Sequence, residues 1–183
     1  MKPLQRAICL VLVLAACGSP EPVDEADKAL FLRVADLAGL GVRYADPEAG
    51  ETFTRTKQID GSYELAYTFQ SVAGQRPLYL HGNVTVGLKP SNAVTSEGAR
   101  KIGLLIGFTK NGIEERELPG MHIGNLSLLV KDEAPIGNVF TMSDGNKSHM
   151  VVMAGLYVKD PATWQKLMAP KLEQLSRYST ARP

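Results

Sequence analysis

The side chains that most often bind metals or transfer protons are few in this sequence. It contains three histidines, His81, His122 and His149, and no two of them stand at a spacing of two or four residues. A zinc or copper site would therefore have to be assembled from distant elements. Scattered surface and edge positions are the simpler interpretation, and we predict no metal site.

Known catalytic motifs give no better lead. The sequence has no G-x-S-x-G, H-E-x-x-H or P-loop motif, and Gly82, Gly87 and Gly103 do not form a phosphate cradle. A Ser-His-Asp triad could be drawn from many residues, so drawing one carries no information. Residues 144–146 (Asp-Gly-Asn) lack the leading acid and the closing glutamate of a calcium loop, so they favour a hairpin turn. We predict no catalytic residue and no cofactor, and we expect that the protein is not an enzyme.

The residue with the clearest chemistry is a cysteine near the start. Lys2 and Arg6 form a positive region, and the apolar run over residues 7–14 is too short to span a bilayer, which is typical of a secretory signal. The run ends in Leu14-Ala15-Ala16-Cys17, which resembles a bacterial lipobox. The resemblance implies diacylglycerol on the Cys17 thiol, cleavage before Cys17 and acylation of the new amino terminus. The alternative is an ordinary secretory signal with an unrelated cysteine.

The lipobox carries an expected location. Several acyl chains give stable membrane attachment, so the lipid on Cys17 would anchor the protein in the bacterial cell envelope. Gly18, rather than Asp, follows the cysteine, and this resembles the pattern of lipoproteins sorted to the periplasmic face of the outer membrane. We therefore expect the outer membrane rather than the inner membrane.

Length and charge set further limits. Cleavage of residues 1–16 from the 183-residue chain would leave 167 residues, which suits one domain with a substantial core. The chain has 20 basic and 19 acidic residues, and the signal removes Lys2 and Arg6, so the mature net charge is near −1. This balance does not favour nucleic acid as a partner. Cys9 leaves with the signal and Cys17 carries lipid, so no disulfide can form.

The mature chain divides into three predicted parts. Residues 17–27 are rich in Pro and acidic side chains, which predicts a lipidated cysteine and a flexible tether. Residues 28–178 form a single domain, and residues 179–183 form a disordered tail. A first helix is expected over residues 25–38, with Leu30, Val34 and Leu37 as its apolar stripe.

Alternating and helical patterns predict the rest of the domain. Strands are expected at 52–59, 62–71, 78–88, 113–118, 123–131, 139–142 and 148–158, and both faces of the last are apolar, as in a central strand. A helix over 95–108 is expected to bury Val94, Ile102, Leu105 and Ile106. A third helix, opened by Asp160-Pro161, is expected to bury Trp164 and to kink or restart at Pro170.

The order of these elements resembles the PsbP-like family of α/β/α sandwich domains. The resemblance covers residues 51–178 and rests on the 95–108 helix, the Leu118-Pro119-Gly120-Met121 turn, the 139–158 hairpin and Asp160-Pro161. It implies an α+β fold with a largely antiparallel sheet and helices on its faces. The N-terminal helix departs from the strand-first beginning of that family. The family serves in assembly, binding and adaptor roles and brings no catalytic set to this sequence.

Three function classes remain from the sequence. The first is a membrane-anchored lipoprotein that binds an envelope protein, as an assembly, adaptor or immunity factor. The second is a periplasmic carrier of a small ligand, which would need a cavity lined by Tyr63, Tyr67, Tyr79 or Trp164. The third is a cryptic hydrolase. An exposed apolar patch beside a full core would favour the first class.

Overall fold

The structure is a computed structural model that describes residues 18–72 and 74–181. Cys17 and the rest of the predicted signal lie outside the described residues. Eight strands of the described chain form one sheet in the order β1-β2-β3-β4-β8-β7-β6-β5, and every neighbouring pair is antiparallel. The strands are β1 (Gly18–Glu21), β2 (Glu51–Gln58), β3 (Tyr63–Gln70), β4 (Tyr79–Val86), β5 (Ile113–Glu117), β6 (Asn125–Lys131), β7 (Ala134–Asp144) and β8 (Lys147–Ala154).

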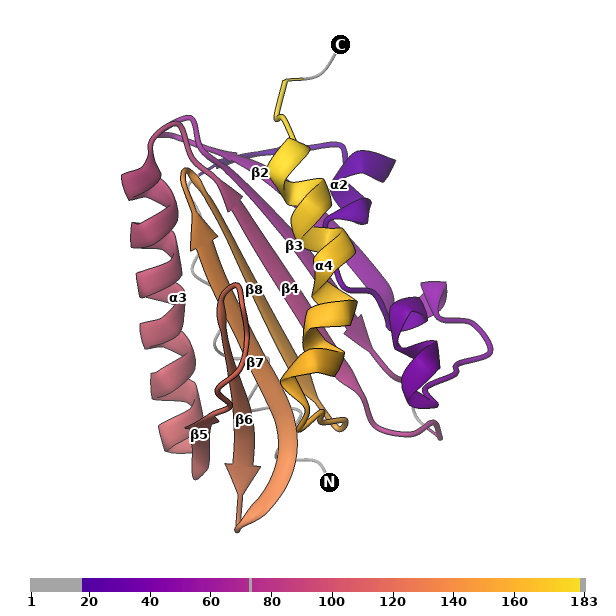
Figure 1. Cartoon of the computed structure of the whole chain (residues 1–183). Coiled ribbons are helices and arrows are strands. Elements are labelled where there is room, and N and C mark those ends of the chain that lie inside the picture. The colour runs from indigo at the N-terminus through magenta and orange to yellow at the C-terminus, as the bar shows by residue number, and fades with distance from the viewer. Residues whose placement is uncertain (1–17, 73, 182–183) are drawn as a thin grey trace.

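Helices cover both faces of this sheet. The helix α3 (Pro90–Lys110) packs on one face, where it contacts β4, β5, β7 and β8. The helices α2 (Glu25–Ala29) and α4 (Pro161–Arg177) lie on the other face with the 3-10 helix η1 (Val34–Leu40), as Figure 1 shows. A short 3-10 turn, η2 (Glu48–Gly50), precedes β2. The predicted α+β class, with an antiparallel sheet and helices on its faces, is confirmed.

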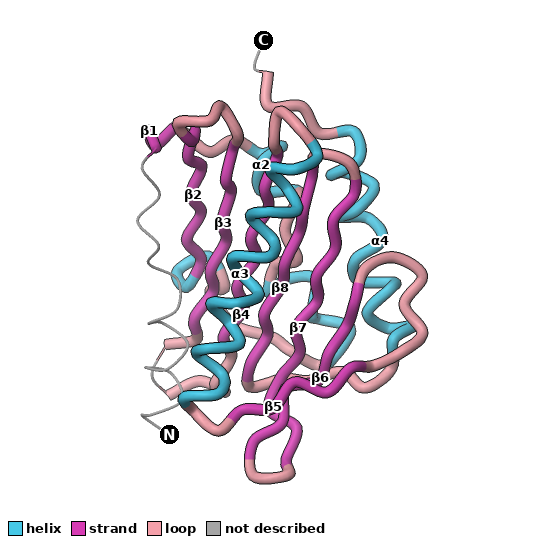
Figure 2. The backbone as a smooth tube through the Cα atoms, turned by 90° about the vertical axis from the view of Figure 1, so that its left-hand side faces the viewer, coloured by secondary structure: helices cyan, strands magenta, loops and turns pink. Residues whose placement is uncertain are grey.

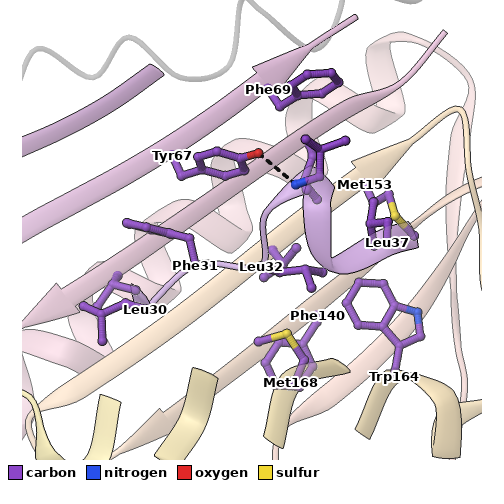
Figure 3. Close-up of a cluster of buried hydrophobic side chains, with 14 of the residues drawn as sticks. Leu30, Phe31, Leu32, Leu37, Tyr67, Phe69, Phe140, Met153, Trp164 and Met168 are labelled. Atoms are coloured by element: carbon purple, nitrogen blue, oxygen red, sulfur yellow. Dashed lines mark hydrogen bonds between the residues drawn. The ribbon is translucent and has the colours of Figure 1, made fainter. Parts of the chain in front are cut away.

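The main core lies between the sheet and α4. Trp164 is fully buried, and its ring stacks on that of Phe140 from β7 with centroids 6.4 Å apart. The same layer contains Phe31, Tyr67 and Phe69, and the Tyr67 hydroxyl accepts a hydrogen bond from the Val34 backbone N–H (Figure 3). The predicted burial of Trp164 is confirmed. Helix α4 begins at the Asp160 cap, as predicted, but it continues through Pro170 instead of restarting there.

The predicted tether is wrong over its described part. Gly18–Glu21 is the edge strand β1, which pairs with β2 in the register Gly18↔Gln58 to Glu21↔Arg55 (Figure 2). The Glu21 carboxylate accepts a hydrogen bond from Nε of Arg55, whose guanidinium is buried. Because an edge strand tolerates proline, Pro20 does not prevent this pairing. Residues 18–21 are therefore part of the folded domain, ahead of the predicted start at residue 28.

The predicted first helix over 25–38 is also wrong. Asp24 and Asp27 form a capping box that starts α2, and the helix ends at Ala29. The next three side chains, Leu30, Phe31 and Leu32, are all buried. Three consecutive buried residues exceed what one stripe of a surface helix can supply, so the chain leaves the helix to pack them. It turns again only in η1.

Two further expectations are wrong over the described residues: the disordered C-terminal tail and the set of α3 side chains that are buried. Residues 179–181 are described, and the Thr180 carbonyl accepts a hydrogen bond of 3.0 Å from Nη2 of Arg55. On α3, the side chains that pack on the sheet are Leu104 and Phe108. The four residues expected to be buried are each more than half exposed: Val94, Ile102, Leu105 and Ile106.

Candidate functional site

The three histidines lie far apart in the fold. His81 on β4 faces α3, and its Nδ1 lies 3.0 Å from the Thr68 hydroxyl. His149 on β8 lies on the opposite face, against the rings of Phe31 and Phe140. His122 is exposed in the segment between β5 and β6. Among the described residues, no group of three or more His, Cys, Asp or Glu side chains gathers as a metal ion would require.

The two buried histidines should make the domain sensitive to acid. Burial lowers the pKa of His149 to about 3 and that of His81 to about 4, from an ordinary value of 6.5. Both rings are therefore neutral in the folded protein at pH values where the unfolded chain takes up protons. Below pH 6.5 the free energy of unfolding should fall, by up to about 1.4 kcal/mol per pH unit for each histidine, until the pH reaches the folded pKa.

The variant His149→Leu isolates this effect, because neither ring nitrogen of His149 has a hydrogen-bond partner in the described chain. Its free energy of unfolding should depend less on pH between 6.5 and 4 than that of the unchanged protein, as measured by urea unfolding at several pH values. A substitution of an exposed aliphatic residue, Val72→Ala, should keep the original dependence. An unchanged slope in His149→Leu would contradict the assignment.

The best candidate site in the described chain is a groove between α4 and the end of β7. It has a volume of about 360 Å³. Met142 and Met168 are buried and belong to the main core, so they form its floor, while the partly buried Met121 and Leu172 and the exposed Ile123 form its walls. We call it the methionine groove. Its remaining lining residues are Asp144, Gln165, Ala169, Glu173 and Ser176.

Two local features build this groove. The α4 residues that line it recur at helical spacing from Gln165 to Ser176, so they share one side of the helix. The opposite wall is the segment before β6, which approaches β7 at Gly124. That glycine has φ +76°, and a Cβ there would lie 2.6 Å from the Thr141 carbonyl oxygen. A side chain at residue 124 would therefore clash with β7, so the close approach of the two segments requires glycine.

The chemistry of the groove suits binding of an apolar group. Thioether side chains are flexible and polarizable, so three methionines can adapt to an apolar surface of irregular shape. The carboxylates of Asp144 and Glu173 add negative charge, although Glu173 also pairs with Arg177 at 2.7 Å. The groove thus offers apolar contact and attraction for a neighbouring cation.

The sequence did not indicate this groove. Its methionines come from a turn, a strand and a helix, at positions 121, 142 and 168, and no periodic pattern connects them. The aromatic side chains that we considered for a carrier cavity do not line it. Tyr67 and Trp164 are fully buried, Tyr79 is buried, and the Tyr63 ring is covered by the guanidinium of Arg55, 4.6 Å from its centroid.

A cluster of buried polar side chains around Arg55 has a structural role. Arg55 on β2 is buried. Its Nη1 donates a hydrogen bond of 2.8 Å to the Asp27 carboxylate and one of 2.7 Å to the Tyr178 hydroxyl. Together with the bonds to Glu21 and Thr180, these contacts tie β1, α2 and the C-terminal tail to the sheet. These partners of the guanidinium therefore stabilise the fold, and none of them lines the methionine groove.

Comparison with known proteins gives no match: no protein-family model, no curated protein and no solved structure is similar to this chain. In the part of the chain that the structure describes, no helix has the length and apolar character to cross a membrane.

Proposed function

We propose that this protein is a lipid-anchored component of the bacterial cell envelope, held by Cys17 in the outer membrane, that binds an envelope protein without catalysis. It would act as an assembly, adaptor or immunity factor. The lipobox sequence supports the anchor. The observation that carries the binding role is the methionine groove, because it combines an apolar floor with adaptable walls and opens on the surface.

The groove indicates what it would bind. An apolar side chain of the partner would rest on Met142 and Met168, and a basic residue next to it would be attracted to Asp144 and Glu173. The expected occupant is therefore a short segment of an envelope protein with an apolar residue beside a lysine or arginine. We also propose that the domain is PsbP-like, which would imply an assembly, binding or adaptor role; the antiparallel sheet with helices on both faces supports this proposal.

A second function has one observation in its favour. A volume of about 360 Å³ lies within the usual range for small-molecule pockets, so the groove could hold a small apolar ligand. The protein would then be a periplasmic carrier. The two functions differ in what fills the groove, which a cross-linking experiment can resolve.

The test places a photo-cross-linking amino acid at Ile123 or Leu172 in the lipidated protein and irradiates intact cells. Both residues line the groove and are not fully buried, so the substitution should be tolerated. We expect one adduct with a defined envelope protein from either position. The matched control is Val72, which is exposed and does not line the groove, and it should not give that adduct.

The variant Leu172→Asp should abolish the adduct formed from Ile123, because it places a charge in the apolar wall. An adduct of equal yield from Val72 would contradict the groove as the binding site. If no protein is captured and native mass spectrometry instead shows a small apolar molecule bound to the protein, the carrier function is correct.

A further inference from the structure

A row of exposed aliphatic side chains runs from the β2–β3 turn along the outer side of α3. Each of these side chains is between 51 and 86% exposed: Ile59, Leu88, Val94, Ile102, Leu105 and Ile106. We call them the apolar ridge. Single exposed aliphatic residues are common, but a contiguous group marks a surface that contacts something apolar. No described segment of the chain covers the ridge.

Two contacts connect the β2–β3 turn to the beginning of α3. The Leu88 side chain packs over Gly61, where a Cβ would lie 2.9 Å from Leu88 Cδ1. The Asp60 carboxylate accepts a hydrogen bond of 2.7 Å from Nδ2 of Asn92, in the first turn of α3. The β2–β3 turn and the beginning of α3 are therefore fixed to each other, and Ile59, Leu88 and Val94 lie at one end of the molecule.

The sheet below α3 explains why the ridge faces outward. Under the helix, β4 and β8 present His81, Asn83, Thr85 and Ser148, and all of these polar side chains are buried. Arg100 of α3 reaches Glu64 of β3 at 2.7 Å. Beside this polar strip, the same face of the sheet carries an apolar patch on which Leu104 and Phe108 pack: Leu129, Val139, Met150 and Val152. The helix therefore turns Arg100, Leu104 and Phe108 to the sheet and leaves its aliphatic stripe outside.

The predicted lipid is attached beside this ridge. Gly18 is covalently bonded to Cys17, so the Cα atoms of the two residues are about 3.8 Å apart. Gly18 pairs with Gln58, and Gln58 immediately precedes Ile59. Gly18, the residue that follows Cys17 in the sequence, is thus part of the sheet. The lipid would therefore bring this end of the domain to the membrane surface.

The charges on α3 suit the same surface. Lys89 precedes the helix, and Lys101 and Lys110 lie along it, whereas Glu97 is its only acidic residue. The Glu97 side chain is mostly buried, and its Oε1 forms an ion pair with Nζ of Lys101 at 3.0 Å. Within α3, basic side chains therefore outnumber acidic ones. Aliphatic side chains flanked by lysine are typical of helices that lie in the headgroup region of an anionic membrane.

We propose that the apolar ridge lies in the headgroup region of the phospholipid membrane that carries the lipid of Cys17. This inference rests on the proposed lipid anchor. It orients the domain: α3 faces the membrane, and α4 with the methionine groove, on the opposite face of the sheet, is turned away from it (Figure 1). The groove is then open to partners in the periplasm.

The test uses the mature lipidated protein in vesicles of phosphatidylethanolamine and phosphatidylglycerol. The variants Leu88→Cys and Ile102→Cys each introduce the only free thiol, because Cys17 is consumed by the lipid, and a fluorophore is attached there. We expect a blue shift, quenching by lipids that carry a doxyl group, and loss of quenching by iodide. The control Ile123→Cys, exposed beside the groove, should remain quenched by iodide.

A second variant tests whether the ridge itself makes the contact. Ile102→Asp together with Ile106→Asp, added to the Leu88→Cys protein, should restore quenching of the label by iodide while the lipid on Cys17 remains.

Labels at Leu88 and Ile102 that stay open to iodide, on a protein with lipid on Cys17, would overturn the inference and leave the anchor intact. Protection of these labels in native envelopes but not in vesicles would assign the ridge to a protein partner and would also overturn it. Absence of lipid on Cys17 by mass spectrometry would overturn the proposed anchor together with the inference.

Discussion

Trp164→Ala is expected to lower the free energy of unfolding by about 3 to 5 kcal/mol, the usual cost of removing a large buried aromatic side chain. Trp164 is fully buried, and its ring stacks on Phe140, so the substitution leaves a cavity between α4 and the sheet. The indole N–H has no hydrogen-bond partner in the described chain, which makes the loss one of packing. Chemical unfolding of the two proteins measures it.

The control for this prediction is Tyr157→Ala, because Tyr157 is an aromatic residue that is 42% exposed. It should change the free energy of unfolding by no more than about 0.5 kcal/mol, as is usual for surface positions. If Trp164→Ala instead kept the thermal midpoint and lost partner binding, Trp164 would be a recognition residue and the packing role would be wrong.

Arg55→Met is expected to have an effect of similar size, about 3 to 5 kcal/mol, because it removes the cation from a buried ion pair. Asp27 is fully buried and lies 2.8 Å from the guanidinium, so its carboxylate would keep its burial and lose this opposite charge. The same substitution releases the bonds from Arg55 to Glu21 and Thr180. Urea unfolding of the variant gives the loss.

The double variant Arg55→Met and Asp27→Leu distinguishes a buried charge from simple loss of contacts. It should recover much of the stability, since replacing both members of a buried pair by apolar side chains is often close to neutral. Lys28→Met is the control, because Lys28 pairs with the exposed Glu25 and such surface pairs contribute little. A double variant no more stable than Arg55→Met would contradict the charge argument.

Local patterns in the sequence were sufficient for strands β2 to β8 and for the last helix, but not for β1. Alternation in residues 62–71 predicted β3, where Leu65, Tyr67 and Phe69 are buried on one face. The apolar faces of 148–158 predicted β8, which lies between β4 and β7. Asp160-Pro161 predicted the start of α4. In each case the residues that form the sequence pattern are neighbours in the chain and are the same residues that form the element.

The failures arise where distant residues decide the structure. Glu21 and Asp27 are acidic residues in a proline-containing segment, and their bonds to Arg55, about thirty positions away, help to fix that segment on the sheet. The side of α3 that meets the sheet is the one with Arg100, Leu104 and Phe108, because these residues fit Glu64 and an apolar patch of the sheet. The helix sequence alone cannot indicate that fit. The turn at Asp132 and Glu133, both with positive φ, extends β7 back to Ala134 without the glycine that usually indicates such a turn.

The candidate site shares this limit. The methionine groove depends on a close approach at Gly124 and on three methionines from different elements. The apolar ridge required the position of β1, which places the residue after Cys17 next to the β2–β3 turn. The sequence motif predicts the anchor, whereas the methionine groove and the apolar ridge can be recognised only in the tertiary structure.

Anchoring of the chain through Cys17 is tested most directly by mass spectrometry of the mature protein purified from its own membrane. We predict a chain that begins at Cys17 and carries diacylglycerol on the thiol and an acyl group on the amino terminus. The variant Cys17→Ser should lack these masses and leave the membrane fraction. An unmodified Cys17, or cleavage at another position, would contradict the account.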